Sequence, residues 1–299
     1  MSNSAQHPTS RRAFIALTGA ALTTAIGSGL PGTATAAAMA FQDQQMMSYL
    51  DQAAWVPQGT PNVRQIYIGS APWCPACQAL HRRLASYNGD VQFRWIQAYA
   101  RDTNNQAQNR SAAFWRVPDV LDAVYETGKI KPADSAEAQW MADWNEGVIN
   151  ALRNTIKARV GKYATPILFW ETKGGIEVTF GAKADFDRII QQIVARPQAR
   201  DIVPAATLFP AKVLQDKAIQ PTNLFASKGA VTLYAVPSRS APALWRLDAR
   251  TGAASNRIVT TRNGQQWAHF NLWKAGKVFT GGWASLEEVF LNGGRPASF

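Results

Sequence analysis

Two cysteines, Cys74 and Cys77, are the only cysteines in this chain of 299 residues, and two residues separate them. Residues 63–69, just before them, are mostly apolar and rich in β-forming side chains, which predicts a strand buried at the centre of a sheet. Residues 78–86, just after them, are compatible with a helix. In this order of segments Cys74 falls at a helix N-terminus, where free N–H groups and the positive end of the helix dipole stabilise a thiolate.

The chemistry of the pair follows from that position. A thiolate is the species that attacks disulfides. Cys77, one helical turn further on, is close enough to resolve a mixed disulfide formed on Cys74. Pro75 falls in the first helical turn, where its missing N–H is not needed and its fixed φ helps to start the helix. The spacing therefore predicts a redox-active Cys74–Cys77 disulfide.

Other uses of closely spaced cysteines fit this sequence less well. Attachment of a c-type haem needs a histidine directly after the second cysteine, and this chain has Gln78 there. A zinc site needs two more ligands, of which His81 could supply one. A purely structural disulfide would close too short a loop to stabilise the fold appreciably. We therefore expect no metal and no organic cofactor.

A second motif, Ala164-Thr165-Pro166, opens an apolar run that extends to Trp170. This run predicts a central strand. The following Lys173-Gly174-Gly175 turn and the β-rich residues 176–181 predict a hairpin partner for that strand. Residues 185–194 predict a helix that closes the domain.

With these motifs, residues 61–197 resemble the thioredoxin fold, and within it the catalytic domain of the periplasmic disulfide isomerases and reductases that include DsbC and DsbG. The resemblance implies an α/β domain in which the Thr165–Pro166 peptide bond is cis and faces the cysteine pair. It also implies that Thr165 and Pro166 bind the extended chain of the substrate. Ile68 occupies a position where thioredoxin itself keeps a buried acid. This departure favours the isomerase and oxidase relatives.

Three further residues belong to the predicted site. Trp73, adjacent to the predicted nucleophile Cys74, is the best candidate for substrate contact among the tryptophans. Pro75 and Ala76, between the two cysteines, complete the active-site motif and tune the stability of the Cys74 thiolate.

Residues 101–162 form a long insertion between the strand predicted around residues 91–96 and the Thr-Pro motif, and we expect this insertion to be helical. Apolar side chains recur every four residues and give one stripe: Trp140, Trp144, Val148, Leu152 and Ile156. Asp134 or Ser135 offers a helix N-cap ahead of the stripe. The tryptophans are most simply core residues, although one of them could line a hydrophobic groove beside Cys74.

Residues 198–299 differ in character and predict a β-rich C-terminal domain or extension of no recognised family. Residues 230–236 and 243–247 are rich in β-forming side chains. Three prolines occur near the beginning of the region, before these β-rich runs: Pro204, Pro210 and Pro221.

One hairpin is predicted within this region. Asn263-Gly264 is the preferred sequence of a two-residue type I′ turn, because both positions of that turn need φ above zero. The turn would join strands at residues 257–262 and 265–273. His269 shares a strand face with Trp267, where a lone histidine is more typical of a half-buried surface residue than of a ligand.

Residues 1–40 have the form of a signal peptide, and residues 41–60 form a short N-terminal segment. Ser10-Arg11-Arg12-Ala13-Phe14 and the weakly apolar stretch after it resemble a twin-arginine export signal. An ordinary secretory leader that contains two arginines is the alternative. Three positions complete a small-x-small pattern after which cleavage could occur: Ala36, Ala38 and Ala40. We expect the mature protein in the periplasm, an oxidising compartment.

Charge and composition exclude several classes. The formal net charge of +11 raises the question of a nucleic-acid or membrane-surface partner. The Lys and Arg residues are scattered, however, and the longest basic run is His81-Arg82-Arg83. We expect a solvated basic surface and no nucleic acid. The only long apolar stretch lies within residues 1–40, which excludes a multi-span membrane protein.

The sequence therefore favours a periplasmic thiol–disulfide oxidoreductase or isomerase. Its partners would be protein clients with cysteines or disulfides and a membrane redox partner that restores the cysteine pair. The residues leave open whether it acts as oxidase, isomerase or reductase. The alternative is an assembly or chaperone factor for an envelope or secretion complex, in which the thioredoxin fold is a scaffold and the C-terminal region binds the client.

Overall fold

The structure is a computed structural model that describes residues 43–87, 89–97, 121, 124–125, 135–226, 229–249, 251–274, 277–291 and 295–296. The predicted signal peptide lies outside the described residues, and so does most of the predicted insertion before residue 135. The described part begins with a helix at residues 43–52. Within that part, no helix combines the length and the apolar character needed to cross a membrane.

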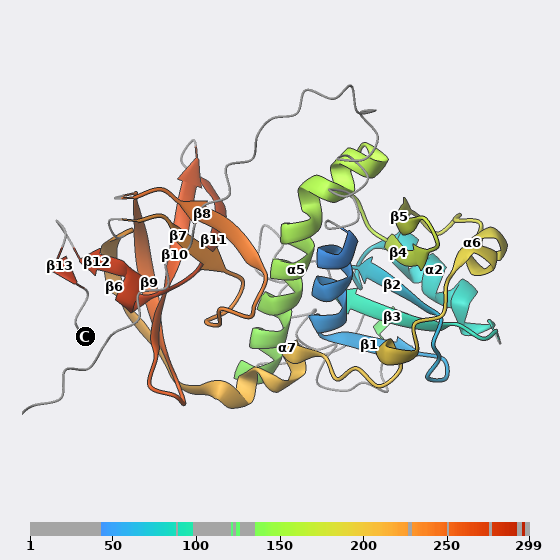
Figure 1. Ribbon diagram of the computed structural model, residues 1–299, viewed down its shortest axis with the longest axis horizontal. Helices are drawn as coiled ribbons and strands as arrows, with labels where there is room; N and C mark the ends of the chain where they lie inside the picture. The colour runs from blue at the N-terminus through green and yellow to red at the C-terminus, as the bar shows by residue number, and fades with distance from the viewer. Residues whose placement is uncertain are drawn as a thin grey trace, which may run out of the picture.

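A five-stranded sheet makes up one half of the described fold (Figure 1). Its strands are β1 (Trp55–Gln58), β2 (Gln65–Ser70), β3 (Gln92–Gln97), β4 (Ile167–Thr172) and β5 (Gly175–Phe180). They lie in the order β1-β3-β2-β4-β5, with β2 and β3 parallel and the other neighbouring pairs antiparallel. The central strand β2 is buried along its whole length, as its apolar sequence predicts.

Two helices flank this sheet side by side. α2 (Pro75–Ala85) connects β2 to β3, and α6 (Phe186–Gln192) follows the β4–β5 hairpin. The Arg83 guanidinium on α2 donates to the carbonyl oxygens of Ala182 and Ala184, just before α6, at 3.1 and 2.9 Å. A β-α-β unit followed by a hairpin and a closing helix is a thioredoxin-like α/β topology, so that part of the fold prediction is confirmed.

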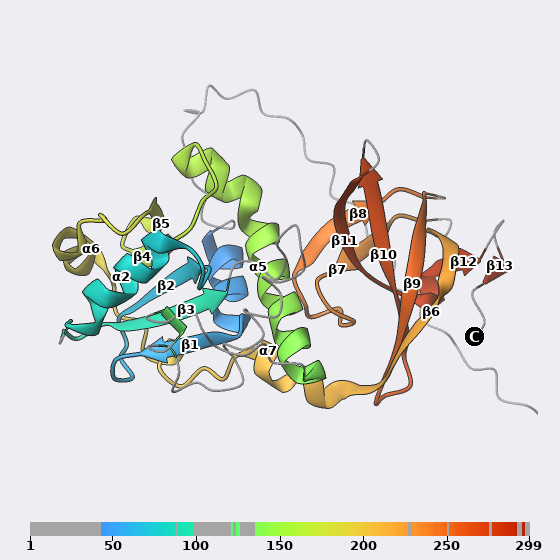
Figure 2. The same ribbon diagram turned by 180° about the vertical axis from the view of Figure 1, so that it is seen from behind.

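α5 (Ala136–Val160) lies between β3 and β4 in the chain, within the predicted insertion. Ser135 caps its first turn, because the Ser135 hydroxyl accepts a hydrogen bond from the Ala138 N–H at 3.1 Å. The helix ends at Gly161, which has a left-handed backbone with φ of 75°. All five residues of the predicted apolar stripe are buried. Figures 1 and 2 show α5 between the five-stranded sheet and a second sheet.

Asn145 ties α5 to the N-terminal part of the chain. Its side chain is fully buried. The Asn145 amide oxygen accepts from the Ala54 N–H at 2.7 Å, and its amide nitrogen donates to the Ala54 carbonyl at 2.8 Å. An ion pair between Arg159 and Asp43 joins the same two parts of the chain near the other end of α5. The helix at residues 43–52 is therefore fixed against α5.

The second sheet has eight strands, and all of its described pairs are antiparallel. Their order is β13-β12-β6-β9-β10-β11-β7-β8. The strands are β6 (Val213–Ala226), β7 (Val231–Tyr234), β8 (Ala243–Leu247), β9 (Gly252–Thr261), β10 (Gln266–Lys274), β11 (Lys277–Ser285), β12 (Val289–Leu291) and β13 (Arg295–Pro296). Short helical turns lead into the sheet or interrupt it: η2 (Pro197–Ala199), α7 (Ala205–Leu208), η3 (Pro210–Lys212) and η4 (Leu286–Glu288).

Pro221, one of the three prolines at the beginning of this region, lies within β6, where the pairing with β9 shifts register between Ala218 and Thr222. Proline is tolerated at such irregularities because the ladder hydrogen bond is already interrupted there. One local expectation was wrong: the β9–β10 hairpin exists, but three residues, 262–264, and not two lie between its closing pair Thr261 and Gln265.

That loop is closed by two hydrogen bonds. The Gly264 N–H donates to the Thr261 carbonyl and the Thr261 N–H donates to the Gln265 carbonyl, both at 2.9 Å. Gly264 has a left-handed backbone with φ of 81°. A tight turn followed by one left-handed residue also matches the twist of the paired strands. Asn263-Gly264 therefore marks the hairpin correctly, but the turn is not the predicted two-residue type I′.

The two sheets share one hydrophobic core through α5. The Trp140 ring lies 5.4 Å from the rings of both Phe209 and Trp283, and the Trp144 ring lies 5.7 Å from Phe209. Trp140 and Trp144 are each 2% exposed, so the interpretation of both as core residues is confirmed. The division of the chain between residues 197 and 198 stays a prediction.

Candidate active site

Cys74 occupies the N-cap position of α2, immediately after the central strand β2. Its backbone is extended, and its carbonyl accepts the first hydrogen bond of the helix from the Gln78 N–H at 3.0 Å. Pro75 is the first helical residue. Cys74 is half-buried, whereas Cys77 is fully buried. The strand–cysteine–helix order of the sequence therefore places one reachable and one enclosed sulfur at the start of α2.

The Thr165-Pro166 motif lies against this cysteine pair. The Thr165–Pro166 peptide bond is cis, and Pro166 is buried just before β4. The Cys74 thiol donates to the Thr165 carbonyl oxygen at 3.6 Å, across 91 residues of sequence. The Pro166 carbonyl accepts from the Gly181 N–H at 3.0 Å, which ties the loop to the end of β5. The two motifs singled out in the sequence thus meet in the structure.

The surroundings of Cys74 favour its thiolate. Partial burial acts to raise its pKa, because it penalises the charged form. Hydrogen bonds from Thr165, from the thiol and backbone of Cys77 and from the backbone of Ala76 outweigh that effect, so the pKa of Cys74 lies below its ordinary value. These backbone groups belong to the first turn of α2, where free N–H groups stabilise negative charge.

Cys77 has the opposite environment. Burial raises the pKa of the Cys77 thiol to about 12, and the negative charge of a Cys74 thiolate adds to this rise. A hydrogen bond with the backbone of Ala71 only partly offsets it. Near neutral pH Cys77 is therefore a thiol, while Cys74 forms a thiolate more readily. This difference between the two pKa values suits Cys74 to attack first and Cys77 to react second.

A cluster of buried polar side chains lies beside Cys77. Its members are at most 1% exposed: Ser70, His81, Gln97 and Tyr125. Tyr125 is at its centre, because its hydroxyl shares a hydrogen bond with the Ser70 hydroxyl and accepts one from the Gln97 amide at 3.4 Å. The His81 ring stacks on the Tyr125 ring at 4.9 Å. Burial and then the charge of Cys77 raise the pKa of Tyr125, which therefore remains a hydrogen-bonding phenol.

Sequence reasoning missed this cluster. In the sequence, His81 stands out as a single possible zinc ligand and as part of a basic run, but it also follows Cys77 by one helical turn, and such pairs share a helix face. Tyr125 lies in the predicted insertion, far from either motif in the sequence, and no local sequence pattern predicts its burial. Its contact with His81 is a tertiary contact between residues far apart in the sequence.

The other predicted site residues surround Cys74. Trp73 and Ala76 are half-buried, and Pro75 is exposed. Trp73 precedes the half-buried sulfur directly in the chain, so its predicted contact with substrate stays a prediction. Within the described part of the chain, no group of three or more His, Cys, Asp or Glu side chains is placed to hold a metal ion. The expectation of no cofactor likewise stays a prediction.

Comparisons with known proteins add little to this picture. No protein-family model and no curated protein matches the chain. Among solved structures, the chain is similar to the crystal structure of a disulfide interchange protein from Neisseria gonorrhoeae, with 18% sequence identity and a TM-score of 0.33. The match covers 48% of this chain and 95% of that chain. The fold assignment above rests on strand order and on the geometry of the two motifs.

Proposed function

We propose that this chain is a thiol–disulfide oxidoreductase that acts on the disulfides of protein clients through Cys74 and Cys77. One observation carries the proposal: the Cys74 thiol, at the N-terminus of α2, lies 3.6 Å from the carbonyl oxygen of Thr165 beside the cis bond to Pro166. The pKa values of the two thiols are shifted in opposite directions, as an attacking and a resolving sulfur require.

In the first step the Cys74 thiolate attacks one sulfur of a client disulfide. A bond forms between Cys74 and that sulfur, the client S–S bond breaks, and the other client sulfur leaves as a thiolate. Burial decides which cysteine attacks, because Cys74 is half-buried and Cys77 is fully enclosed.

In the second step Cys77 loses its proton and attacks Cys74. The Cys74–Cys77 disulfide forms, the bond between Cys74 and the client sulfur breaks, and that sulfur leaves as a thiolate. The client has then gained the two electrons that the cysteine pair has lost. Part of the raised pKa of Cys77 comes from the charge of Cys74. That contribution vanishes once the Cys74 sulfur is bound to a client. Deprotonation of Cys77 therefore follows capture of the client.

Thr165 and Pro166 are proposed to hold the client chain in an extended form beside Cys74, with Trp73 in contact with it. The position of Thr165 supports this role, because it touches the attacking sulfur and precedes the buried strand β4. Any client segment that brings a disulfide to Cys74 must pass next to this loop.

The direction and place of the reaction are part of the proposal. The same steps in reverse donate a disulfide, so the reduction potential decides between oxidase, isomerase and reductase. The leader-like residues 1–40 support export to the periplasm by the twin-arginine route. In that compartment a membrane redox partner would restore the pair after each turnover.

The test is a redox titration of the purified chain against glutathione, with thiol state read by alkylation and mass spectrometry. We expect a reversible two-electron couple. A potential near about −120 mV would indicate a disulfide donor, and one near about −200 mV or below an isomerase or reductase. Reduction of insulin disulfides would measure activity on a protein.

Two variants assign the roles. Cys77→Ser should accumulate a mixed disulfide with an oxidised client, because the resolving sulfur is absent. Cys74→Ser should accumulate none, because the remaining sulfur is enclosed. If Cys74 and Cys77 fail to exchange with glutathione, or if Cys74→Ser traps clients as well as Cys77→Ser, the proposed function is wrong.

A further inference from the structure

The end of α5 that leads into the Thr165-Pro166 loop is basic. Between Glu146 and Glu171 the chain contains no acidic residue. The cations of the same stretch are Arg153, Lys157, Arg159 and Lys162. The loop that contacts the attacking sulfur is therefore reached through a segment whose only charges are positive.

Helix stability accounts for two of these cations. Lys157 and Arg159 lie in the last turn of α5, where positive charge complements the helix dipole. Arg159 also forms an ion pair with Asp43. The dipole effect falls off within the last turn, so it does not explain Arg153, about two turns before the helix ends, or Lys162, which lies beyond that end.

Aromatic rings hold these other two cations close to the Thr165-Pro166 loop. The Arg153 guanidinium carbon lies 4.8 Å from the ring centroid of Tyr163, which comes just before the loop in the chain. The Lys162 ammonium nitrogen lies 5.4 Å from the ring centroid of Phe180, which pairs across the sheet with the first residue of β4, just after the loop. Both distances are typical of cation–π contacts. Each cation is thus held beside the loop that the attacking sulfur touches.

Both cations are accessible to a client chain at this loop. Arg153 and Lys162 are exposed. Within the described part of the chain, neither of them forms an ion pair with a carboxylate. Their positive charge is therefore not compensated by the protein and acts on whatever lies next to the loop.

The segment that follows β5 does not cancel this charge. Asp185 and Asp187 lie there, but Lys183 precedes them directly. The Arg83 guanidinium also lies 4.9 Å from the ring centroid of Phe186, the residue between the two aspartates. This segment therefore carries two charges of each sign, and the net charge around the loop stays positive.

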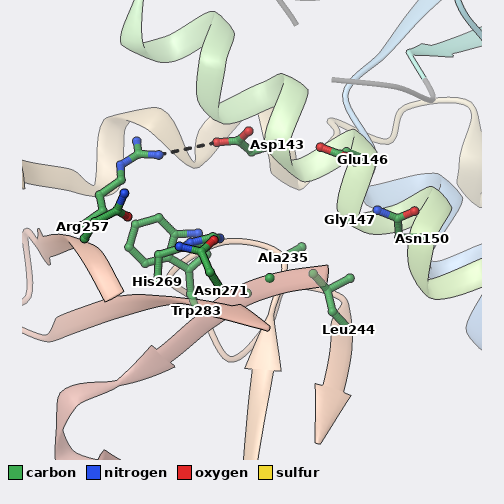
Figure 3. A pocket seen from close by; sticks show the side chains of 13 residues that line it. Asp143, Glu146, Gly147, Asn150, Ala235, Leu244, Arg257, His269, Asn271 and Trp283 are labelled. Carbon is green, nitrogen blue, oxygen red and sulfur yellow. Dashed lines mark ion pairs between the residues drawn. The ribbon is translucent and has the colours of Figure 1, made fainter. Parts of the chain in front are cut away.

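A cation on the other side of α5 is matched by carboxylates instead. A cavity of about 450 Å³ lies between α5 and the second sheet, and Arg257 and His269 are in its wall (Figure 3). Arg257 pairs with Asp216 at 2.5 Å and lies 4.0 Å from Asp143. Compensated charge is thus found where α5 meets the second sheet, and uncompensated charge where α5 leads to the cysteine pair.

We propose that Arg153 and Lys162 select clients whose cysteines are flanked by acidic side chains. This inference rests on the proposed function, because it concerns the client segment that lies beside Cys74. A carboxylate next to the client sulfur is attracted to the two cations as the segment passes the Thr165-Pro166 loop, which raises the rate of encounter with the thiolate. A lysine in the same place is repelled. The bonds that form and break are those of the first step above.

The test compares three disulfide-linked peptide dimers that differ only in charge: acetyl-Glu-Cys-Glu-amide, acetyl-Ser-Cys-Ser-amide and acetyl-Lys-Cys-Lys-amide. The full chain with Cys77→Ser is mixed with each dimer, and mass spectrometry after an acid quench follows the mixed disulfide on Cys74. Each rate is divided by the rate of the same dimer with 2-mercaptoethanol, a neutral thiol, which removes differences in intrinsic reactivity. We expect the Glu dimer to react fastest and the Lys dimer slowest, with smaller differences in about 0.5 M NaCl.

Single variants assign the effect to the two cations. Arg153→Gln and Lys162→Gln should each lower the ratio of the Glu rate to the Ser rate by roughly twofold at low salt, as expected for unit charges about 8 Å apart in water. The ratio cancels any effect of a variant on the Cys74 thiolate itself. The matched control Lys173→Gln removes an exposed lysine in the turn at the far end of the β4–β5 hairpin and should leave the ratio unchanged.

The outcomes separate this inference from the proposed function. If no dimer reacts, the proposed function fails and this inference with it. If all dimers react but the Glu and Ser dimers have equal corrected rates, or if Lys173→Gln loses as much as the two variants, only the charge selection is overturned. Glutathione disulfide, a small anionic disulfide, is the last comparison. A loss with glutathione disulfide in both variants and none with the Glu dimer would overturn the assignment to protein clients.

Discussion

Gly147 is a residue at which helix propensity and packing make opposite predictions. It lies in the interior of α5, where replacing glycine with alanine ordinarily stabilises a helix by about 1 kcal/mol. A Cβ atom at this position, however, would lie 2.1 Å from the Cβ of Ala235 and 3.2 Å from its Cα. Neither atom can rotate away, because both belong to or adjoin the backbone.

The size of the effect follows from that distance. Ordinary carbon–carbon contact begins near about 3.5 Å, so α5 and the β7–β8 connection would have to separate by about 1.4 Å. The Ala235 N–H donates to the Pro242 carbonyl at 2.9 Å, which holds the connection in place. Overpacking of this kind costs about 3 kcal/mol at the upper end of its usual range. After the gain in propensity, we expect Gly147→Ala to destabilise the fold by about 2 kcal/mol.

Urea unfolding followed by tryptophan fluorescence measures this value, and a second variant isolates its cause. Ala235→Gly removes the nearer of the two atoms that the new methyl group would meet. The double variant should therefore recover most of the stability lost by Gly147→Ala, relative to Ala235→Gly alone. A Gly147→Ala protein as stable as the parent, or a double variant with no recovery, would refute the packing argument.

Further predictions concern the thiols and one buried amide. Pulsed alkylation and mass spectrometry of the reduced protein should show Cys74 reacting at lower pH than Cys77, whose thiolate forms only near a pKa of about 12. Thr165→Val should move the ultraviolet titration of the Cys74 thiolate to higher pH, because it removes a hydrogen bond that lowers this pKa; an unchanged titration would contradict that role. Asn145→Ala should destabilise the fold by about 2–4 kcal/mol in urea, since it leaves two buried backbone groups unpaired. The exposed Asn154→Ala should cost less than about 0.5 kcal/mol, and equal losses would refute the assignment.

Local patterns were sufficient to predict much of the first sheet and α5. The apolar residues before Cys74 predicted β2, and the spacing from Trp140 to Ile156 predicted α5 and its buried face. Such elements are readable because each residue's burial repeats with the period of its own helix or strand. The approach of Thr165 to Cys74 was accessible only through the resemblance to a known fold, because no local pattern relates residues 91 positions apart.

Features that depend on packing between elements could not be read in this way. β6 is long and contains Pro221, so its sequence resembles a loop until pairing with β9 shows that the proline lies at a register shift. Tyr125 and the cavity beside His269 are formed by segments whose relative placement is set by tertiary contacts. Their polar side chains carry no periodic signal, since each element contributes only one or two of them.

The shared core determines how the two functional hypotheses can be separated. Deleting residues 198–299 would test the assembly hypothesis most simply, but Phe209 and Trp283 would be lost with them. Trp140 and Trp144 on α5 would then be exposed, and each exposure would lower the free energy of unfolding by about 2–3 kcal/mol. Together these losses are a large part of a typical free energy of unfolding of about 5–15 kcal/mol. If the truncated chain did not support the cellular phenotype, the cause would therefore be an unfolded α5 rather than a missing client surface.

Point substitutions avoid this difficulty. Trp245 is 48% exposed on β8, the edge strand of the second sheet, so Trp245→Ala changes the surface without opening the core. A redox enzyme should lose its cellular phenotype with Cys74→Ser and keep it with Trp245→Ala, whereas an assembly factor that binds clients on this edge should do the reverse. The two variants act on different sheets, so each result can be interpreted without the other.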